Sequence, residues 1–143
     1  MLFRSSGQGA YAISNHHQAA PGSANLLVVD DEDILCRVMA RLLSRAGFQV
    51  WATSDPRQAL SMGTGRDTPF DLLITDVLMP DLNGAELAKS LLEAGKVANV
   101  LFVSGFTGHI TLLDELIAGG ASFLEKPFGA SELVEKARAI LRR

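Results

Sequence analysis

Short apolar runs alternate along the chain with longer segments in which apolar residues recur every three or four positions. The short runs predict five strands, at residues 26–29, 48–52, 72–75, 99–105 and 122–127. The first of them is apolar throughout, which is typical of a strand covered on both faces. The longer segments predict five helices, at residues 35–46, 56–62, 84–92, 110–118 and 133–141.

Strand and helix therefore follow each other five times. This alternation implies right-handed crossovers and a parallel sheet that carries helices on both faces. In sheets of this kind, ligands bind beyond the carboxyl ends of the strands. We therefore expect an α/β fold whose chemistry lies at that end of the sheet.

The first 24 residues differ from the rest of the chain. They are rich in Gly, Ser, Ala, Gln and Asn, and they show neither a helical nor a strand period. We expect residues 1–24 to form a flexible tail or linker and residues 25–143 to form one domain.

Composition narrows the class of protein. Hydrophobic residues make up 48% of the chain and charged residues 20%, so a packed core is expected. The net charge of −3 gives no support for direct binding of nucleic acid. One cysteine, Cys36, cannot form an internal disulfide, and no apolar run approaches the roughly 18 residues that cross a bilayer. The N-terminal region lacks the apolar core of a signal peptide, so we expect a cytoplasmic location without membrane insertion.

Acidic residues follow two of the predicted strands. Asp30 and Asp31 come after the first strand and Asp76 after the third, while Ser104 and Lys126 lie at the ends of the fourth and fifth. If these strands lie side by side, the five groups converge on one edge of the sheet. At about 4 to 5 Å and an effective dielectric constant near 20, each pair of carboxylates costs about 3 to 4 kcal/mol, which a cation must offset. Hard oxygen ligands favour Mg²⁺, with Mn²⁺ as the alternative.

This combination of groups is suited to phosphoryl transfer onto a carboxylate. The metal ion, the lysine and the hydroxyl would each neutralise one oxygen of the transferred group. The product would be an acyl phosphate on Asp76.

The site residues, taken in order along the chain, resemble those of the receiver domains of two-component response regulators. The set comprises Asp30, Asp31, Asp76, Ser104, Lys126 and Pro127. After Asp76, Pro80 and Gly84 fit the family signature D-x-x-M-P-x-x-x-G. The resemblance covers about residues 25–143 and implies a flavodoxin-like, doubly wound (βα)5 fold with a five-stranded parallel sheet. The stretches FVSGFTG and FLEKPF are most similar to receivers at the C-terminus of hybrid histidine kinases.

The resemblance implies a role for each residue of the site. Asp76 would be the phosphoacceptor, and Lys126 would contact the phosphoryl group and pair with Asp76 in its absence. Mg²⁺ would be bound directly by Asp31, by Asp76 and by the backbone carbonyl of Leu78, and through water by Asp30.

The resemblance also implies a conformational switch. Ser104 would engage the phosphoryl group, and Phe123 would turn inward in response. Gly105 would leave room for the phosphate. The Lys126–Pro127 peptide bond would be cis, which fixes the direction of the lysine.

The implied partners are a histidine kinase or a histidine phosphotransfer protein, whose phosphohistidine supplies the phosphoryl group. Phosphorylation would change the surface formed by the helix at 110–118, the strand at 122–127 and the last helix. A homodimer would form through the same surface. The domain would phosphorylate and dephosphorylate itself without turning over an external substrate, so we do not expect an enzyme.

Two alternatives remain open from the sequence. A degenerate receiver would act only as a protein-binding module. A phosphatase resembling the haloacid dehalogenases would also use a strand-end aspartate and Mg²⁺, but it needs a second acid two residues later, where this chain has Leu78. A dinucleotide-binding fold is disfavoured because no G-x-G-x-x-G motif follows the first strand.

Overall fold

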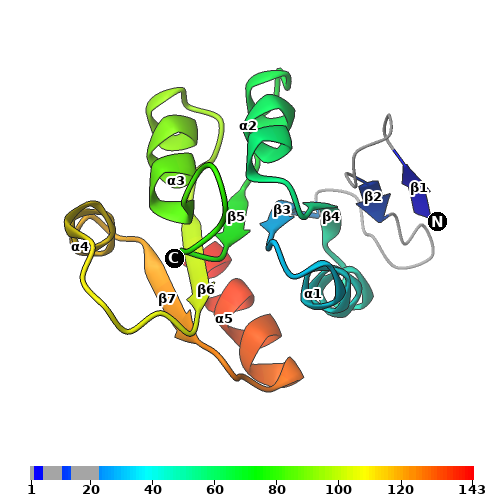
Figure 1. Cartoon of the computed structure of the whole chain (residues 1–143). Helices are drawn as coiled ribbons and strands as arrows, with labels where there is room; N and C mark the ends of the chain where they lie inside the picture. Colours follow the sequence, from blue (N-terminus) through cyan, green and yellow to red (C-terminus); the bar gives the residue numbers. More distant parts are fainter. Residues whose placement is uncertain (1, 5–10, 14–22) are drawn as a thin grey trace.

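The structure is a computed structural model that describes residues 2–4, 11–13 and 23–143. In this part of the chain, five parallel strands share one sheet with the order β4-β3-β5-β6-β7. They are β3 (Asn25–Val29), β4 (Gln49–Thr53), β5 (Leu72–Thr75), β6 (Val100–Ser104) and β7 (Ser122–Glu125). The predicted doubly wound fold with a five-stranded parallel sheet is therefore confirmed (Figure 1).

Two short strands that the sequence analysis did not predict extend this sheet beyond β4. β2 (Tyr11–Ile13) pairs antiparallel with β4, and β1 (Leu2–Arg4) pairs antiparallel with β2. The remaining residues of the predicted tail, 1, 5–10 and 14–22, lie outside the described part. The division at residue 24 into a tail or linker and a domain stays a prediction.

Five helices of the described chain cover the two faces of the sheet. They are α1 (Asp33–Arg45), α2 (Pro56–Thr64), α3 (Gly84–Glu93), α4 (Thr111–Ala118) and α5 (Ala130–Arg142). Helices α1 and α5 pack on one face, and α2, α3 and α4 pack on the other (Figure 1). None of the helices in the described residues is both long enough and apolar enough to span a membrane.

Local sequence explains where two of the helices begin. Asp55 accepts a hydrogen bond from the N–H of Arg57 at 2.9 Å, and Pro56 occupies the first helical position of α2. At α3, Asn83 accepts from the N–H of Glu86 at 2.8 Å, and the Glu86 side chain accepts from the N–H of Asn83. This reciprocal pair is a capping box, which sets the start of α3 directly after the loop at residues 76–83 that follows β5.

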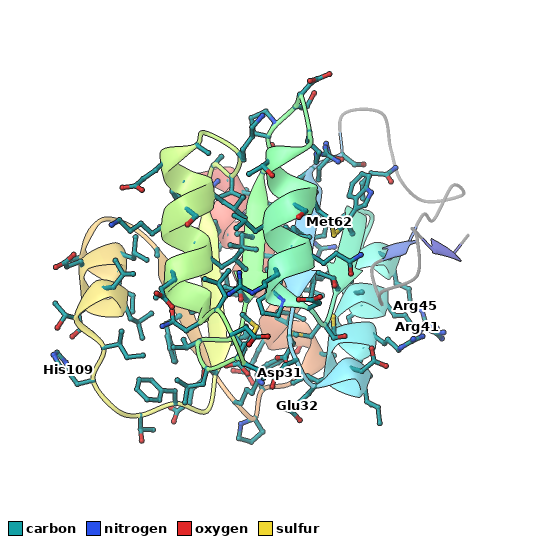
Figure 2. All side chains as sticks on the ribbon, turned by 45° about the horizontal axis from the view of Figure 1, so that its top comes forward. Asp31, Glu32, Arg41, Arg45, Met62 and His109 are labelled. Atoms are coloured by element: carbon teal, nitrogen blue, oxygen red, sulfur yellow. The ribbon has the colours of Figure 1, made fainter. Side chains whose placement is uncertain are left out.

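The parallel strands all end at the same edge of the sheet, as parallel pairing requires. Asp30 follows β3, Asp76 follows β5, and Lys126 follows β7. Asp31 and Glu32 lie just before α1 at this end of the molecule (Figure 2). The topology thus brings together side chains that are far apart in the sequence.

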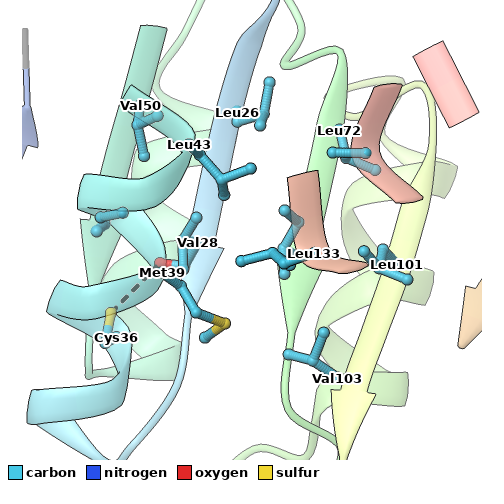
Figure 3. Packing of buried hydrophobic residues seen from close by; sticks show 14 of the residues in the cluster. Leu26, Val28, Cys36, Met39, Leu43, Val50, Leu72, Leu101, Val103 and Leu133 are labelled. Carbon is cyan, nitrogen blue, oxygen red and sulfur yellow. Dashed lines mark hydrogen bonds between the residues drawn. The ribbon is translucent and has the colours of Figure 1, made fainter. Parts of the chain in front are cut away.

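Two hydrophobic clusters lie on opposite sides of the sheet. Leu26 and Val28 of β3 contact the cluster under α1 and α5, which Figure 3 shows with Leu43 of α1. Leu27 and Val29 belong to the cluster under α2, α3 and α4. Successive side chains of a strand point to opposite faces, so a strand that is buried on both faces must be apolar at every position.

Candidate functional site

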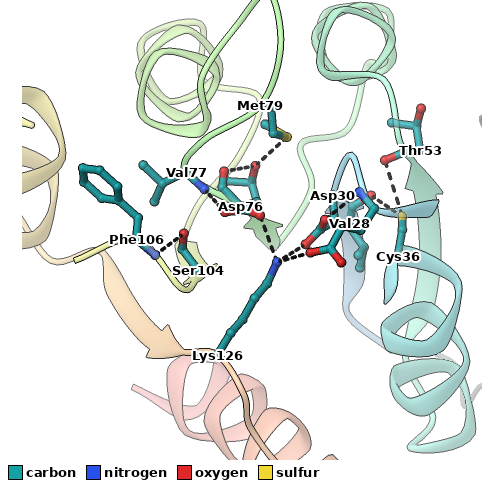
Figure 4. A network of polar contacts seen from close by, with 12 residues as sticks. Val28, Asp30, Cys36, Thr53, Asp76, Val77, Met79, Ser104, Phe106 and Lys126 are labelled. Carbon is teal, nitrogen blue, oxygen red and sulfur yellow. Dashed lines mark hydrogen bonds and ion pairs between the residues drawn. The ribbon is translucent and has the colours of Figure 1, made fainter. Parts of the chain in front are cut away.

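The ammonium group of Lys126 lies at the centre of a cluster of carboxylates (Figure 4). Lys126 Nζ is 2.9 Å from Asp76 Oδ2, 2.9 Å from Asp30 Oδ2 and 3.3 Å from Glu32 Oε1. The side chain of Lys126 is only 16% exposed, so its ion pairs with the buried Asp30 and Asp76 are largely shielded from solvent, whereas the pair with the exposed Glu32 is not. The ends of β3, β5 and β7 therefore meet in one polar site.

Asp76 is held by both of its carboxylate oxygens. Oδ1 accepts a hydrogen bond from the backbone N–H of Val77 at 2.6 Å, and Oδ2 accepts from Lys126. The hydroxyl of Thr75 donates to the backbone carbonyl of Asp76 at 2.9 Å. A carboxylate fixed in this way is presented to the loops at the end of the sheet with one defined orientation.

Gly84 explains part of the signature that follows Asp76. Its N–H donates to the carbonyl of Val77 at 2.7 Å, so the start of α3 lies directly against the end of β5. A Cβ atom at residue 84 would collide with the backbone carbonyl of Asp76. Only glycine permits this close approach.

Asp30 is fully buried, and its charge is stabilised by few groups. Its Oδ1 accepts from the N–H of Glu32 at 2.9 Å, and its Oδ2 accepts from Lys126. Burial raises the pKa of Asp30 above its ordinary value of 3.8, although these two hydrogen bonds act in the opposite direction. Burial alone would lower the pKa of Lys126, but the carboxylates of Asp76 and Asp30 outweigh it and raise this pKa above 10.5.

Three carboxylates in the described residues are placed to share a cation. Asp30, Glu32 and Asp76 each have an oxygen within 4.8 Å of the others. Oxygen ligands of this kind fit Mg²⁺ or Mn²⁺, so the donor set suits the predicted metal. Asp31, the predicted direct ligand, is exposed and is not part of this group.

Glu32 is the residue that the sequence analysis missed. Its N–H bonds to Asp30 Oδ1, which is an Asx turn, and this turn carries the Glu32 side chain toward Lys126. The signal in the sequence was an acid two residues after a strand-ending aspartate. The predicted roles of Asp31 and of the Leu78 carbonyl stay predictions. Leu78, two residues after Asp76, is 53% exposed.

Ser104 and Lys126 are linked through the backbone. The N–H of Lys126 donates to the carbonyl of Ser104 at 3.0 Å, which ties the end of β6 to the end of β7. Ser104 is buried, and its Oγ accepts from the N–H of Phe106 at 3.1 Å, so its hydroxyl keeps its own proton to donate. The Lys126–Pro127 peptide bond is cis.

The two remaining predicted residues lie close to this link. Gly105 follows Ser104, and a Cβ atom there would meet no other atom within 4 Å. Phe123 lies on β7, is partly buried, and packs against the cluster under α2, α3 and α4. Its register partner on β6 is Phe102, two residues before Ser104.

Comparison with known proteins decides the family. Residues 26–138 match the family described as the response regulator receiver domain. The chain belongs to this family. As a receiver domain of two-component systems it is a signalling domain, and the family works with histidine kinases or phosphotransfer proteins. The predicted function as a receiver is therefore confirmed.

Several relatives agree with this assignment. The chain is 36% identical over 118 residues to the response regulator MprA of Mycobacterium leprae, covering 82% of this chain and 51% of MprA. It is 36% identical over 121 residues to the transcriptional regulatory protein CpxR of Escherichia coli K12, covering 82% of this chain and 49% of CpxR. The receiver domain thus spans about half the length of these curated relatives.

Solved structures show the same fold. The receiver domain of the hybrid histidine kinase CckA superposes with a TM-score of 0.69 and 33% identity, covering 82% of this chain and 98% of that one. The chemotaxis protein CheY4 of Vibrio cholerae superposes with a TM-score of 0.70 and 29% identity, with the same coverage of 82% and 98%.

Proposed function

We propose that Asp76 accepts a phosphoryl group from a phosphohistidine on a histidine kinase or a histidine phosphotransfer protein. The observation that carries this proposal is the position of the Asp76 carboxylate. It lies at the end of a central strand, 2.9 Å from the ammonium of Lys126 and beside the buried Asp30. A nucleophile, a cation for the transferred group and a second acid are thus assembled in one place.

In the proposed transfer, a carboxylate oxygen of Asp76 forms a bond to phosphorus while the phosphorus–nitrogen bond of the phosphohistidine breaks. The imidazole nitrogen leaves with the electron pair of that bond. Lys126 then has to release the Asp76 oxygen and pair with an oxygen of the phosphoryl group, where it offsets negative charge. The hydroxyl of Ser104 donates to another phosphoryl oxygen.

We further propose that the site works with Mg²⁺, or with Mn²⁺ in its place. Asp31, Asp76 and the Leu78 carbonyl would hold the ion directly, and Asp30 would hold it through water. When bound, the ion supplies positive charge that offsets the acidic cluster and the incoming phosphoryl oxygens. The acidic cluster of Asp30, Glu32 and Asp76 supports this proposal, and it adds Glu32 as a competing ligand.

The proposed output is a change in the surface formed by α4, β7 and α5. Movement of Ser104 toward the phosphoryl group would break its hydrogen bond from Phe106, which begins the loop to α4. The space left would let Phe123 turn inward from β7. The resulting surface would bind its partner, or a second copy of the chain, with a different affinity.

The parent system is proposed from likeness alone. Similarity to the receiver of the hybrid histidine kinase CckA supports a place in such a kinase, in the cytoplasm. Several curated relatives are instead named as transcriptional regulators, and the receiver domain spans about half of their length. We propose that this domain does not itself contact nucleic acid, because the net charge of the whole chain is −3.

The decisive experiment is incubation with acetyl phosphate and Mg²⁺, followed by intact-mass measurement. We expect a gain of about 80 Da, one phosphoryl group, that disappears in Asp76→Asn. Asp81→Asn is a matched control, because Asp81 is exposed and lies five residues further along the same loop. It should keep the gain. A gain that persists in Asp76→Asn would contradict the assignment of the acceptor.

The same experiment separates the alternatives. A degenerate receiver that only binds proteins would show no gain in mass under any condition. A receiver would gain the phosphoryl group and later lose it by hydrolysis of its own acyl phosphate. A phosphatase would in addition turn over an added phosphate ester, which a receiver would not. Leu78, at the position where a dehalogenase-like phosphatase needs its second acid, cannot transfer a proton.

A further inference from the structure

Strand β4 forms one edge of the five-stranded parallel sheet, and the N-terminal strands lie along it. β2 pairs with β4 through three register positions, Tyr11 with Ala52, Ala12 with Trp51 and Ile13 with Val50. β1 then pairs with β2 on its outer side. This arrangement lies at the opposite side of the sheet from β7, so it is separate from the proposed switch surface.

The direction of the backbone groups on β4 follows from its other neighbour. The N–H of Gln49 donates to the carbonyl of Ala24, and the carbonyl of Thr53 accepts from the N–H of Asp30, so both residues face β3. Backbone groups of successive strand residues point to alternate sides. Val50 and Ala52 therefore direct their N–H and carbonyl groups outward, toward Ile13 and Tyr11.

Without β2, these outward groups would form an unpaired edge. β4 is five residues long and carries Val50, Trp51 and Ala52 in succession, a length and composition that favour pairing with another chain. With the N-terminal strands in place, the outermost strand of the described sheet is β1, which has only three residues. A very short edge strand is one of the devices that reduce edge-to-edge association.

We propose that the outer edge of β4 is a strand-binding site that residues 11–13 occupy within the same chain. Their occupancy prevents a second copy of the chain from pairing with this edge. The proposal is independent of phosphorylation, because none of the site residues contributes to the pairing of β2 with β4. The outer edge of β4 recognises the backbone N–H and carbonyl groups of an extended strand.

Amide hydrogen exchange of the full chain, read residue by residue with NMR, tests the pairing. The amides of Val50 and Ala52 should exchange slowly. Ile13→Pro removes the N–H that faces Val50. At a concentration at which the variant is monomeric, it should speed exchange at Val50 and Ala52 by about tenfold or more. The amides of Trp51 and Thr53 face β3 and should keep their protection, which provides an internal control within the same strand.

The second measurement is sedimentation velocity of the full chain over a wide range of concentration. Ile13→Pro should self-associate at lower concentration than the unmodified chain. The unmodified chain is the reference, because it shows any association that occurs through other surfaces. Ile13→Val is the matched control at the same position, because it keeps the backbone N–H, so it should associate like the unmodified chain. Fast exchange at Val50 and Ala52 in the unmodified chain would overturn the proposal. So would an Ile13→Pro variant that associates no more than the unmodified chain.

Discussion

At the scale of single residues, the site is short of positive charge. Lys126 is paired with Asp76, Asp30 and Glu32, so one ammonium faces three carboxylates. Oxygens of the three carboxylates lie within 4.8 Å of one another. Like charges about 4 to 5 Å apart repel by about 3 to 4 kcal/mol at an effective dielectric constant near 20. Burial of Asp30 adds to this cost and raises its pKa. A divalent cation would remove the excess negative charge, which is the physical reason to expect one here.

Asp31 and Glu32 offer two different third ligands for that cation. The family resemblance assigns Asp31, whereas the described geometry places Glu32 near Asp30 and Asp76. We expect Asp31→Asn to weaken Mg²⁺ binding by about tenfold or more, because it removes a ligand charge. Glu32→Gln should have a smaller effect, since the Glu32 side chain is 66% exposed. Isothermal titration calorimetry measures both, and the reverse order would assign the third ligand to Glu32.

Gly84 is a residue whose lack of a side chain can be tested directly. Gly84→Ala would drive a Cβ atom into the Asp76 carbonyl, and the backbone has to shift to accept it. We expect a loss of about 2 to 3 kcal/mol in the free energy of unfolding, measured in urea. Gly105→Ala is the matched control, because its Cβ would meet no atom within 4 Å. Equal losses in the two variants would contradict the close packing of Gly84.

At the scale of elements, β6 and β7 are coupled at their carboxyl ends. One hydrogen bond joins the Lys126 N–H to the Ser104 carbonyl, and another joins the Phe106 N–H to the Ser104 hydroxyl oxygen. Ser104 therefore contacts both Lys126, which directly follows β7, and the loop that leads to α4. A displacement of this hydroxyl would be felt in both elements.

Removing that hydroxyl should separate phosphorylation from the switch. In Ser104→Ala, we expect Asp76 still to gain the phosphoryl group. Beryllofluoride, an analogue of the phosphoryl group, should no longer change the amide hydrogen exchange of α4 and β7 in this variant. Ser104→Thr keeps a hydroxyl and should retain the response, so it serves as the control. A full response in Ser104→Ala would remove Ser104 from the switch.

The elements also show what the sequence could predict. The parallel strands were found because burial on both faces demands apolar runs such as residues 26–29 and 72–75. Strands β1 and β2 were missed because three residues are too few to show a period, and their pairing depends on β4, which follows them in the chain. Glu32 was missed for a similar reason: its position depends on a turn around Asp30 rather than on a strand end.

At the scale of the whole molecule, the residues that form the hydrophobic core and the residues of the polar site lie in different parts of the sheet. Two hydrophobic clusters hold the helices on its two faces, and the polar site lies beyond the strand ends rather than within either cluster. Lys126 belongs to the polar site and also links the strands, because its ion pairs join the ends of β3, β5 and β7. Its protonation should therefore contribute to the stability of the fold.

The pH dependence of stability tests this contribution. The pKa of Lys126 is raised on folding above its ordinary value of 10.5, so the folded state holds the proton more tightly. The resulting stabilisation is complete below pH 10.5 and is lost as the pH rises further. We expect Lys126→Met to lower the free energy of unfolding by on the order of 3 kcal/mol near neutral pH. The difference from the unmodified chain should shrink in strongly alkaline urea titrations; a difference that stays constant would contradict the linkage.

Strand β3 has hydrogen-bonded neighbours on both sides and hydrophobic packing on both faces. Asp30 takes its position from the end of this strand, whereas Asp31 and Glu32 stand on an exposed rim just before α1. Asp30 is thus fixed by the packing of the strand that it follows, whereas Asp31 and Glu32 are exposed, so a change of their side chains disturbs little packing. Redesign of the site for an ion of another radius should therefore vary residues 31 and 32 and leave residue 30 unchanged.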